Sequence, residues 1–217
     1  MGPDAPTGVI ISIPSNTLDV PVKQFRSQNS GDWNNTSTWQ LSYNGGLNWG
    51  NATSTPLISN GLVAIQNGHT ITISANAGVS DLTINTGGSL SVNGGKQLSV
   101  SGTLTNNGTL QLLSDLNGTA TIITNGSIAG NGTYKAQQYL STTRNWYLAS
   151  PITNATAPSG YTYFKYDEPG NNNGFIAPST AYWESIAIGG TLNPLVGFIT
   201  QPSLGNTTIE FSGTALN

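Results

Sequence analysis

Short apolar–polar–apolar triplets recur along the middle of the chain, separated by glycine and asparagine. Because side chains alternate between the two faces of a strand, such a triplet sends both apolar groups to one face and the polar group to the other. The pattern therefore predicts short β-strands with one buried face. Between residues 81 and 112 the triplets are Leu82-Thr83-Ile84, Leu90-Ser91-Val92, Leu98-Ser99-Val100 and Leu110-Gln111-Leu112.

The triplets form three interleaved series that share a period of about 20 residues, which is typical of one coil in a β-solenoid. Stacked coils pair strand on strand and bury a continuous apolar column. A flat meander is the alternative, since Asn-Gly also favours hairpins, but a meander does not explain the common period. The series are Val63/Ile65, Leu82/Ile84 and Leu104; Ile71/Ile73, Leu90/Val92 and Leu110/Leu112; Val79, Leu98/Val100 and Ala120/Ile122.

Glycine-containing pairs stand between the triplets, where the chain must turn from one strand to the next. We expect them to supply the left-handed backbone that tight corners need. With these corners, a parallel β-solenoid (β-helix) is predicted for residues 25–136. The pairs are Gly87-Gly88, Gly94-Gly95, Asn107-Gly108, Asn117-Gly118 and Asn131-Gly132.

The two flanking regions have a different character. Residues 1–24 contain four prolines and a short strand-like run from Val9 to Ile13, and are expected to be an arm that adds one edge strand or, equally, a disordered linker. Residues 137–217 lose the period and are rich in aromatics. Their alternation predicts a compact antiparallel, β-sandwich-like module, which makes the whole chain all-β. The expected strands are 145–149, 162–166, 181–186, 197–201 and 207–212.

Composition narrows the classes of partner. Only 7% of residues are charged, against roughly a quarter in ordinary globular proteins, so the polar faces must be built from Thr, Ser, Asn and Gln. A net charge of −3 with six Lys and Arg argues against nucleic acid, which needs clustered cations. The absence of cysteine excludes disulfides and thiolate metal sites. No apolar run is long enough to predict a membrane span.

Several phrases resemble the repeat modules of very large secreted and surface proteins of Bacteroidetes. The order of these phrases is more specific than any one of them, and the resemblance covers residues 25–217. It implies an adhesin-like β-solenoid protein, cargo of type IX secretion, that is secreted or held at the cell surface. The phrases are SGDWNNTSTWQLSYNGGLNWGNATSTP, LVAIQNGHTITISANAGVSDLTINTGGSLSV, AQQYLSTTRNWYLASPI, YFKYDEPGNNNGF, AYWESI and PLVGFITQPSLGNTTIEFSGTALN.

Two groups of aromatic residues are the candidates for ligand binding, because flat rings can stack on sugars. The module offers Trp183 together with Tyr161, Tyr163 and Tyr166, and the start of the solenoid offers Trp49. Alternating aromatics in strands also serve as core, so that alternative stays open. Trp33 and Trp39 are expected instead to cap the open end of the column.

Acidic and histidine chemistry is sparse. Asp167 and Glu168 are neighbours in the chain, and neighbours in a strand point to opposite faces, which does not suit a catalytic carboxylate pair. With the amide oxygens of Asn171, Asn172 and Asn173 they form a candidate calcium site, or a solvated turn, and no other cofactor is expected. His69 is the only histidine and is predicted to be structural, at a turn that enters a strand.

These observations predict a non-catalytic structural or adhesive segment of a secreted, surface-displayed bacterial protein. Its partner would be a cell-surface or extracellular matrix component, with a neutral glycan as one candidate. The alternative is a carbohydrate-binding module of a secreted glycan-degrading enzyme. Catalysis by this chain itself is not expected, because no acid–base constellation emerges from the sequence.

Overall fold

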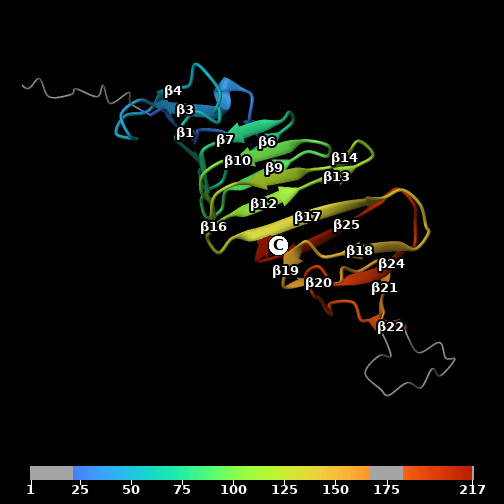
Figure 1. The fold of residues 1–217 in the computed structure, drawn as a ribbon. Helices are drawn as coiled ribbons and strands as arrows, with labels where there is room; N and C mark the ends of the chain where they lie inside the picture. Colours follow the sequence, from blue (N-terminus) through green and yellow to red (C-terminus); the bar gives the residue numbers. More distant parts are fainter. Residues whose placement is uncertain (1–21, 167–182, 217) are drawn as a thin grey trace, which may run out of the picture.

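The apolar positions of the triplets stack into a column, and three parallel sheets surround it (Figure 1). The structure is a computed structural model that describes residues 22–166 and 183–216. Nearly all inward triplet side chains are fully buried, as the period-two pattern predicts. The predicted fold class, all-β with a parallel β-solenoid, is confirmed.

The first sheet carries the series that begins at Val63. Val63 lies beside Leu82, and Leu82 beside Leu104, in the register that the sequence predicts. Phe25 adds one more rung below Val63, so the sheet begins before the repeat becomes visible in the sequence. Its parallel strands are β1 (Gln24–Ser27), β5 (Leu62–Ile65), β8 (Asp81–Ile84), β11 (Leu104–Asn106) and β16 (Ile128–Ala129).

The second sheet carries the series of Ile71, Leu90 and Leu110, which pair directly in that order. Tyr134 continues the series one coil further, above Leu110. This sheet reaches from the first coil of the column to the C-terminal module. Its parallel strands are β2 (Gly31–Asp32), β6 (Thr70–Ile73), β9 (Ser89–Val92), β12 (Thr109–Leu112) and β17 (Thr133–Leu140).

The third sheet is shorter, and the pairing of its last two strands differs from the predicted register. Val79 pairs with Val100, but Leu98 pairs with Ile122 rather than with Ala120. The difference arises because the chain forms an extra hairpin before it enters the last strand, which moves the register by two residues. The sheet contains β7 (Ala77–Val79), β10 (Gln97–Val100) and β15 (Thr121–Thr124); the hairpin pairs β13 (Ser114–Asp115) with β14 (Gly118–Thr119).

The corner glycines serve two purposes, only one of which was expected. Gly87 and Gly95 have φ of 78° and 68°, the left-handed backbone that glycine adopts easily. At Gly108 the reason is space: a Cβ there would lie 2.2 Å from the carbonyl oxygen of Gly88 in the coil below. Close stacking of successive corners therefore requires glycine at this position even without a left-handed backbone.

The start of the column is closed by a cap. β3 (Trp39–Ser42) pairs antiparallel with β1 and with β4 (Gly50–Asn51), after a 3-10 turn at η1 (Thr36–Thr38). The rings of Trp33 and Trp39 are fully buried and meet edge to face at 5.1 Å between centroids. The indole of Trp39 donates to the carbonyl oxygen of Trp33, so the predicted cap is confirmed.

The C-terminal module is joined to the column by a shared strand. β17 extends past the last coil, and β25 (Thr207–Gly213) pairs antiparallel along its length. The module's main sheet has the order β18 (Trp146–Ala149), β24 (Gly197–Pro202), β21 (Tyr161–Tyr166) and β22 (Trp183–Ile186). Two short antiparallel pairs complete it: β19 (Ile152–Thr153) with β26 (Ala215–Leu216), and β20 (Ala155–Thr156) with β23 (Thr191–Leu192).

The five strands expected in the module are all present, and within the described residues their bounds differ by one residue at most. The boundary predicted between residues 136 and 137 falls inside β17, so column and module have one continuous backbone element in common. The sandwich-like arrangement is not confirmed. What the structure shows is a four-stranded antiparallel sheet whose Phe198 meets Phe211 of β25 at 6.1 Å between ring centroids.

Candidate functional site

The outward side of the four-stranded sheet gathers exposed aromatic residues. Strand alternation directs Tyr163 and Phe198 inward, where both are buried, and their sequence neighbours outward. Tyr147, Ile199 and Phe164 stand directly beside one another across three strands. We call this surface the aromatic face; it consists of Tyr147, Phe164, Tyr166, Trp183 and Ile199, with Asn145, Thr162 and Gln201 at its rim.

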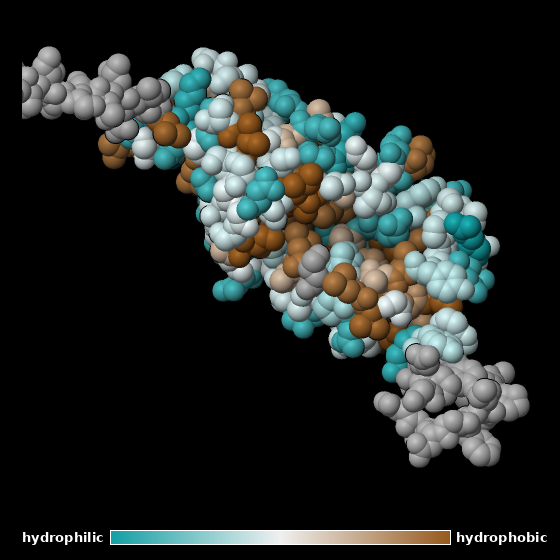
Figure 2. All heavy atoms as spheres, viewed as in Figure 1, coloured by the Kyte–Doolittle hydropathy of each residue, from teal (hydrophilic) through white to brown (hydrophobic). Residues whose placement is uncertain are grey.

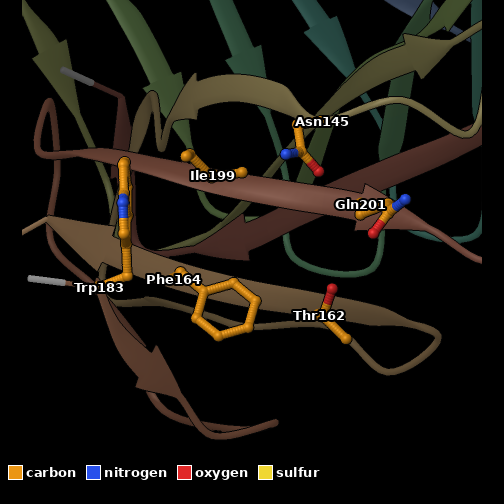
Figure 3. A pocket seen from close by; sticks show the side chains of 6 residues that line it. All are labelled: Asn145, Thr162, Phe164, Trp183, Ile199 and Gln201. Carbon is orange, nitrogen blue, oxygen red and sulfur yellow. The ribbon is translucent and has the colours of Figure 1, made fainter. Parts of the chain in front are cut away.

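Two adjoining hollows lie on the aromatic face, and Trp183 and Ile199 line both of them. One, of about 320 Å³, extends from Trp183 over Phe164 and Ile199 to the polar rim, as Figure 3 shows. The other, of about 210 Å³, lies between Tyr147, Tyr166 and Trp183. The shared tryptophan makes the two hollows parts of one surface.

The shared tryptophan is held by its neighbour across the strand pair. Tyr166 and Trp183 are direct cross-strand partners, and their ring centroids are 5.2 Å apart with planes inclined at 59°. Trp183 remains 44% exposed, and Tyr147 is 76% exposed. Large apolar rings that stay accessible on a rigid sheet are typical of recognition surfaces.

The rim supplies neutral hydrogen-bonding groups. The Gln201 amide donates to the carbonyl oxygen of Thr143 at 2.9 Å, which fixes the orientation of that side chain. Asn145 and Thr162 are exposed at the same rim (Figure 3). Amides and hydroxyls can each donate and accept, so this rim suits a ligand that does the same.

No charged side chain lines either hollow among the described residues. Lys165 and Glu184 lie on the same two strands but at alternate positions, and they form an ion pair of 2.7 Å with each other. The guanidinium of Arg144 lies over the ring of Trp146 at 4.4 Å from its centroid. The aromatic face is therefore electrically neutral.

The structure separates the module aromatics that the sequence grouped together. Trp183 and Tyr166 lie on the aromatic face, whereas Tyr163 is 1% exposed and donates from its hydroxyl to the carbonyl oxygen of Pro158. Burial raises the pKa of Tyr163 far above its ordinary range. Tyr161 is half-buried, and its hydroxyl donates to the carbonyl oxygen of Thr208. Tyr161 and Tyr163 thus belong to the interior side of the sheet.

Trp49 lies far along the chain from this face, at the cap of the column. The Arg26 guanidinium lies over its ring at 4.5 Å from the centroid. A shallow hollow of about 380 Å³ adjoins it, lined also by Tyr43, Asn44 and Asn48. Trp49 and Trp183 therefore cannot form a single platform, and the richer combination of rings and rim groups surrounds Trp183.

The remaining predicted site residues concern metal binding and the single histidine. Asp167, Glu168, Asn171, Asn172 and Asn173 lie outside the described residues, so the calcium site stays a prediction. In the part of the chain that is described, no three His, Asp or Glu side chains cluster as metal ligands would. His69, predicted to be structural, lies at the turn before β6, and its Nδ1 is 2.8 Å from the hydroxyl of the buried Ser27.

Sequence reasoning missed Tyr147, Phe164 and the three rim residues. The signal was available in the parity of positions along β21: Phe164 shares its side of the strand with Tyr166, whereas Tyr161 and Tyr163 point the other way. For Tyr147 and Gln201 no such signal existed, because their strands become neighbours of β21 only through the sheet order.

A charged cluster marks the seam between column and module. Glu210 on β25 accepts from the amides of Gln111 and Gln137, each at 2.9 Å, and pairs with Lys135 at 3.0 Å. Partial burial alone would raise the pKa of Glu210, but these hydrogen bonds and the charge of Lys135 outweigh it and lower the pKa. The cluster joins three strands and is structural in character.

Hydrophobic side chains also gather where the end of the column meets the module, in the middle of the view in Figure 2. A hollow of about 310 Å³ lies there, lined among others by Leu112, Ala136, Phe211 and Leu216.

The described part of the chain contains no helix of the length and hydrophobicity that a bilayer crossing needs.

Comparison of the chain with protein-family models, with curated proteins and with solved structures finds no match.

Proposed function

We propose that this chain is a non-catalytic structural and adhesive segment of a secreted, surface-displayed bacterial protein. The observation that carries the proposal is the neutral aromatic face. The four-stranded sheet that carries it lies at the opposite end of the β-column from the aromatic cap (Figure 1). The column serves as a rigid spacer, and the module presents the contact surface to a cell-surface or extracellular matrix component.

The construction of the column supports the spacer role. Each coil pairs with its neighbours on up to three sides, and the inward residues form one buried cluster with the aromatic cap. Both edges of each short strand pair with neighbouring coils, and its inward face packs in the core. The column therefore has little free surface on which a catalytic or binding site could form. The resemblance to Bacteroidetes surface proteins agrees with this role and with export by type IX secretion.

The adhesive role is tested with beads that carry the full chain. Retention of these beads on extracellular matrix and on intact cells of the source organism is compared with retention of uncoated beads and of beads carrying Trp183→Ala. We expect retention by the wild-type chain and its loss in the variant. Equal retention of coated and uncoated beads, or a cytoplasmic location on cell fractionation, would refute the proposal.

A carbohydrate-binding module of a secreted glycan-degrading enzyme is the second candidate, and the stacking geometry around Trp183 favours it. The two candidates differ in what the complete gene product does. If that product hydrolyses a polysaccharide, and loses activity on insoluble but not on soluble substrate in the Trp183→Ala variant, the module serves an enzyme.

A further inference from the structure

We propose that the aromatic face binds a neutral oligosaccharide across two adjoining sugar subsites, which share Trp183. The inference rests on the proposed adhesive role, because it names the class of ligand for the same surface. It follows from the rings, the rim, the charge balance and the shape of the two hollows.

The rings provide the apolar half of sugar recognition. A pyranose has one face of C–H groups and an equator of hydroxyls, so an accessible aromatic ring covers the first while polar groups meet the second. Trp183 lines both hollows, and Tyr147 and Tyr166 also line the smaller one. Each hollow therefore has at least one ring against which a sugar can lie.

The rim provides the polar half. Gln201 is held by its bond to Thr143, so its carbonyl oxygen and second N–H are presented without further loss of side-chain freedom. Asn145 and Thr162 make no side-chain hydrogen bond to any other described residue. Vicinal sugar hydroxyls both donate and accept, and they satisfy such groups better than an aliphatic chain, which would leave them unpaired.

The charge balance selects against the competing ligand classes. An anionic glycan or a phosphate would need a cation, and the described lining of the hollows contains none. Lys165 is already paired with Glu184 at 2.7 Å. A strand-adding peptide would bind along an edge of the sheet, whereas both hollows lie over its central strands β24 and β21.

The shape favours a chain of sugars over a single one. Pockets for compact ligands commonly measure about 300–1,000 Å³, and here two open hollows of about 320 and 210 Å³ meet at one tryptophan. A linear oligosaccharide can place one unit in each hollow at once. We therefore expect a hexasaccharide to bind more than about tenfold more tightly than the monosaccharide.

Gly197 forms part of the floor of the smaller hollow and provides an unusually clean test. A Cβ built at this position meets no atom within 4 Å, and its φ lies outside the left-handed region. A larger residue there is expected to fill the hollow without disturbing the sheet. The Gly197→Val side chain should therefore occupy the smaller hollow and exclude the ligand. Gly50→Val is the matched control, since Gly50 also has open space around its Cα and lies in β4 at the other end of the molecule.

The experiment is calorimetric titration of the full chain with cellohexaose, mannohexaose and xylohexaose, and with glucose as the monosaccharide. We expect at least one hexasaccharide to bind. Trp183→Ala and Gly197→Val should each weaken that binding by about tenfold or more, while Gly50→Val and Trp49→Ala leave it unchanged. Thermal melting of every variant shows whether the fold is retained.

The inference would be overturned by the absence of binding to any hexasaccharide, by unchanged affinity in the folded Gly197→Val variant, or by loss of affinity in Trp49→Ala alone. Affinity that falls steeply between about 50 and 500 mM NaCl would also contradict a neutral ligand. Beads that still adhere in the presence of saturating hexasaccharides would show that the adhesive ligand is not a neutral glycan, and would leave the adhesive role intact. Glycan binding without bead retention would refute the adhesive role alone.

Discussion

At the scale of single residues, the column depends on positions where the stacked coils leave no space for an additional side-chain atom. Gly108 faces the backbone oxygens of Gly88 and Asn85 in the coil below, at 2.2 and 2.6 Å from an added Cβ. Asn106 occupies an inward position beside Ile84, yet it is polar and 0% exposed. Its amide donates to the carbonyl oxygen of Thr133 and accepts from the N–H of Gly108, so it links successive corners.

Gly108→Ala is expected to lower the free energy of unfolding by about 2–3 kcal/mol, because the clashing atoms belong to backbone that cannot rotate away. Urea denaturation monitored by circular dichroism measures the change. Gly197→Ala is the control, since its Cβ meets open space. A Gly108→Ala protein as stable as the wild type would show that the coils can move apart.

Asn106→Ala is expected to lower the free energy of unfolding by about 2 kcal/mol or more, because it removes a buried amide together with both of its hydrogen bonds, to the Thr133 carbonyl oxygen and from the Gly108 N–H. The adjacent Asn107→Ala serves as control: Asn107 is exposed and we expect a change within about 0.5 kcal/mol. The same denaturation experiment compares the two variants. Equal midpoints would mean that water replaces the amide of Asn106.

At the scale of elements, strand spacing was readable from the sequence as long as the coils kept nearly the same length. Val63, Leu82 and Leu104 were assigned correctly, because each pair is separated by one simple coil. The register failed at Ile122, where the β13–β14 hairpin lengthens the coil. Asn117-Gly118 is a hairpin signal in its own right, but among repeated glycine corners it could not be distinguished from one more corner.

The candidate site shows the same limit in another form. Of the grouped aromatics, Trp183 is exposed whereas Tyr163 is buried, and aromatic density in the sequence does not distinguish these two sides of a strand. Parity along β21 separates Tyr163 from Tyr166, but only the sheet order brings Tyr147 and Gln201 to the same surface. Pairing between distant strands is a property of the folded chain, and no local pattern records it.

The seam at Glu210 predicts a pH dependence of stability. Since the folded pKa lies below the ordinary one, the unfolded chain binds more protons in acid. The stabilisation is complete above the ordinary pKa of a glutamate carboxyl and is lost as the pH falls through the lowered value. Melting temperatures measured between about pH 7 and pH 3 should therefore fall more in the wild type than in Glu210→Gln.

Glu184→Gln is the matched control for this experiment. Its ion pair with Lys165 is about half exposed on both sides, and such pairs contribute little. The acid-dependent part of the melting curve should therefore remain in Glu184→Gln. If Glu210→Gln keeps the same acid slope as the wild type, other carboxylates dominate the pH response.

At the scale of the whole molecule, the column is a stack whose two ends are built differently. The start is closed by Trp33 and Trp39, which cover the first apolar layer. At the other end only the second sheet continues into the module, through β17 and β25, whereas β15 and β16 are the outermost strands of their sheets. The two ends of the column are therefore stabilised differently, one by an aromatic cap and the other by one shared strand.

Trp39→Ala is expected to destabilise the protein by about 3–5 kcal/mol, because it opens a large cavity over the first coil. Hydrogen exchange should show the loss first in β1 and β5, and last in β10 and β12. Trp49→Ala, whose ring is partly exposed and contacts Arg26, should change stability by less than about 1 kcal/mol. Uniform loss of protection along the column would contradict the role of Trp39 as an end cap.

The single strand shared by column and module also determines where the molecule yields under tension. Inside the column, a pull along its axis is resisted by hydrogen bonds on as many as three sides of each coil. At the junction one backbone ladder continues, the seven paired positions of β17 and β25 from Tyr134 to Leu140, and the contacts of Glu210 with Gln111 and Lys135 reinforce it. We therefore expect a load on the aromatic face to open this ladder before it separates the coils of the column.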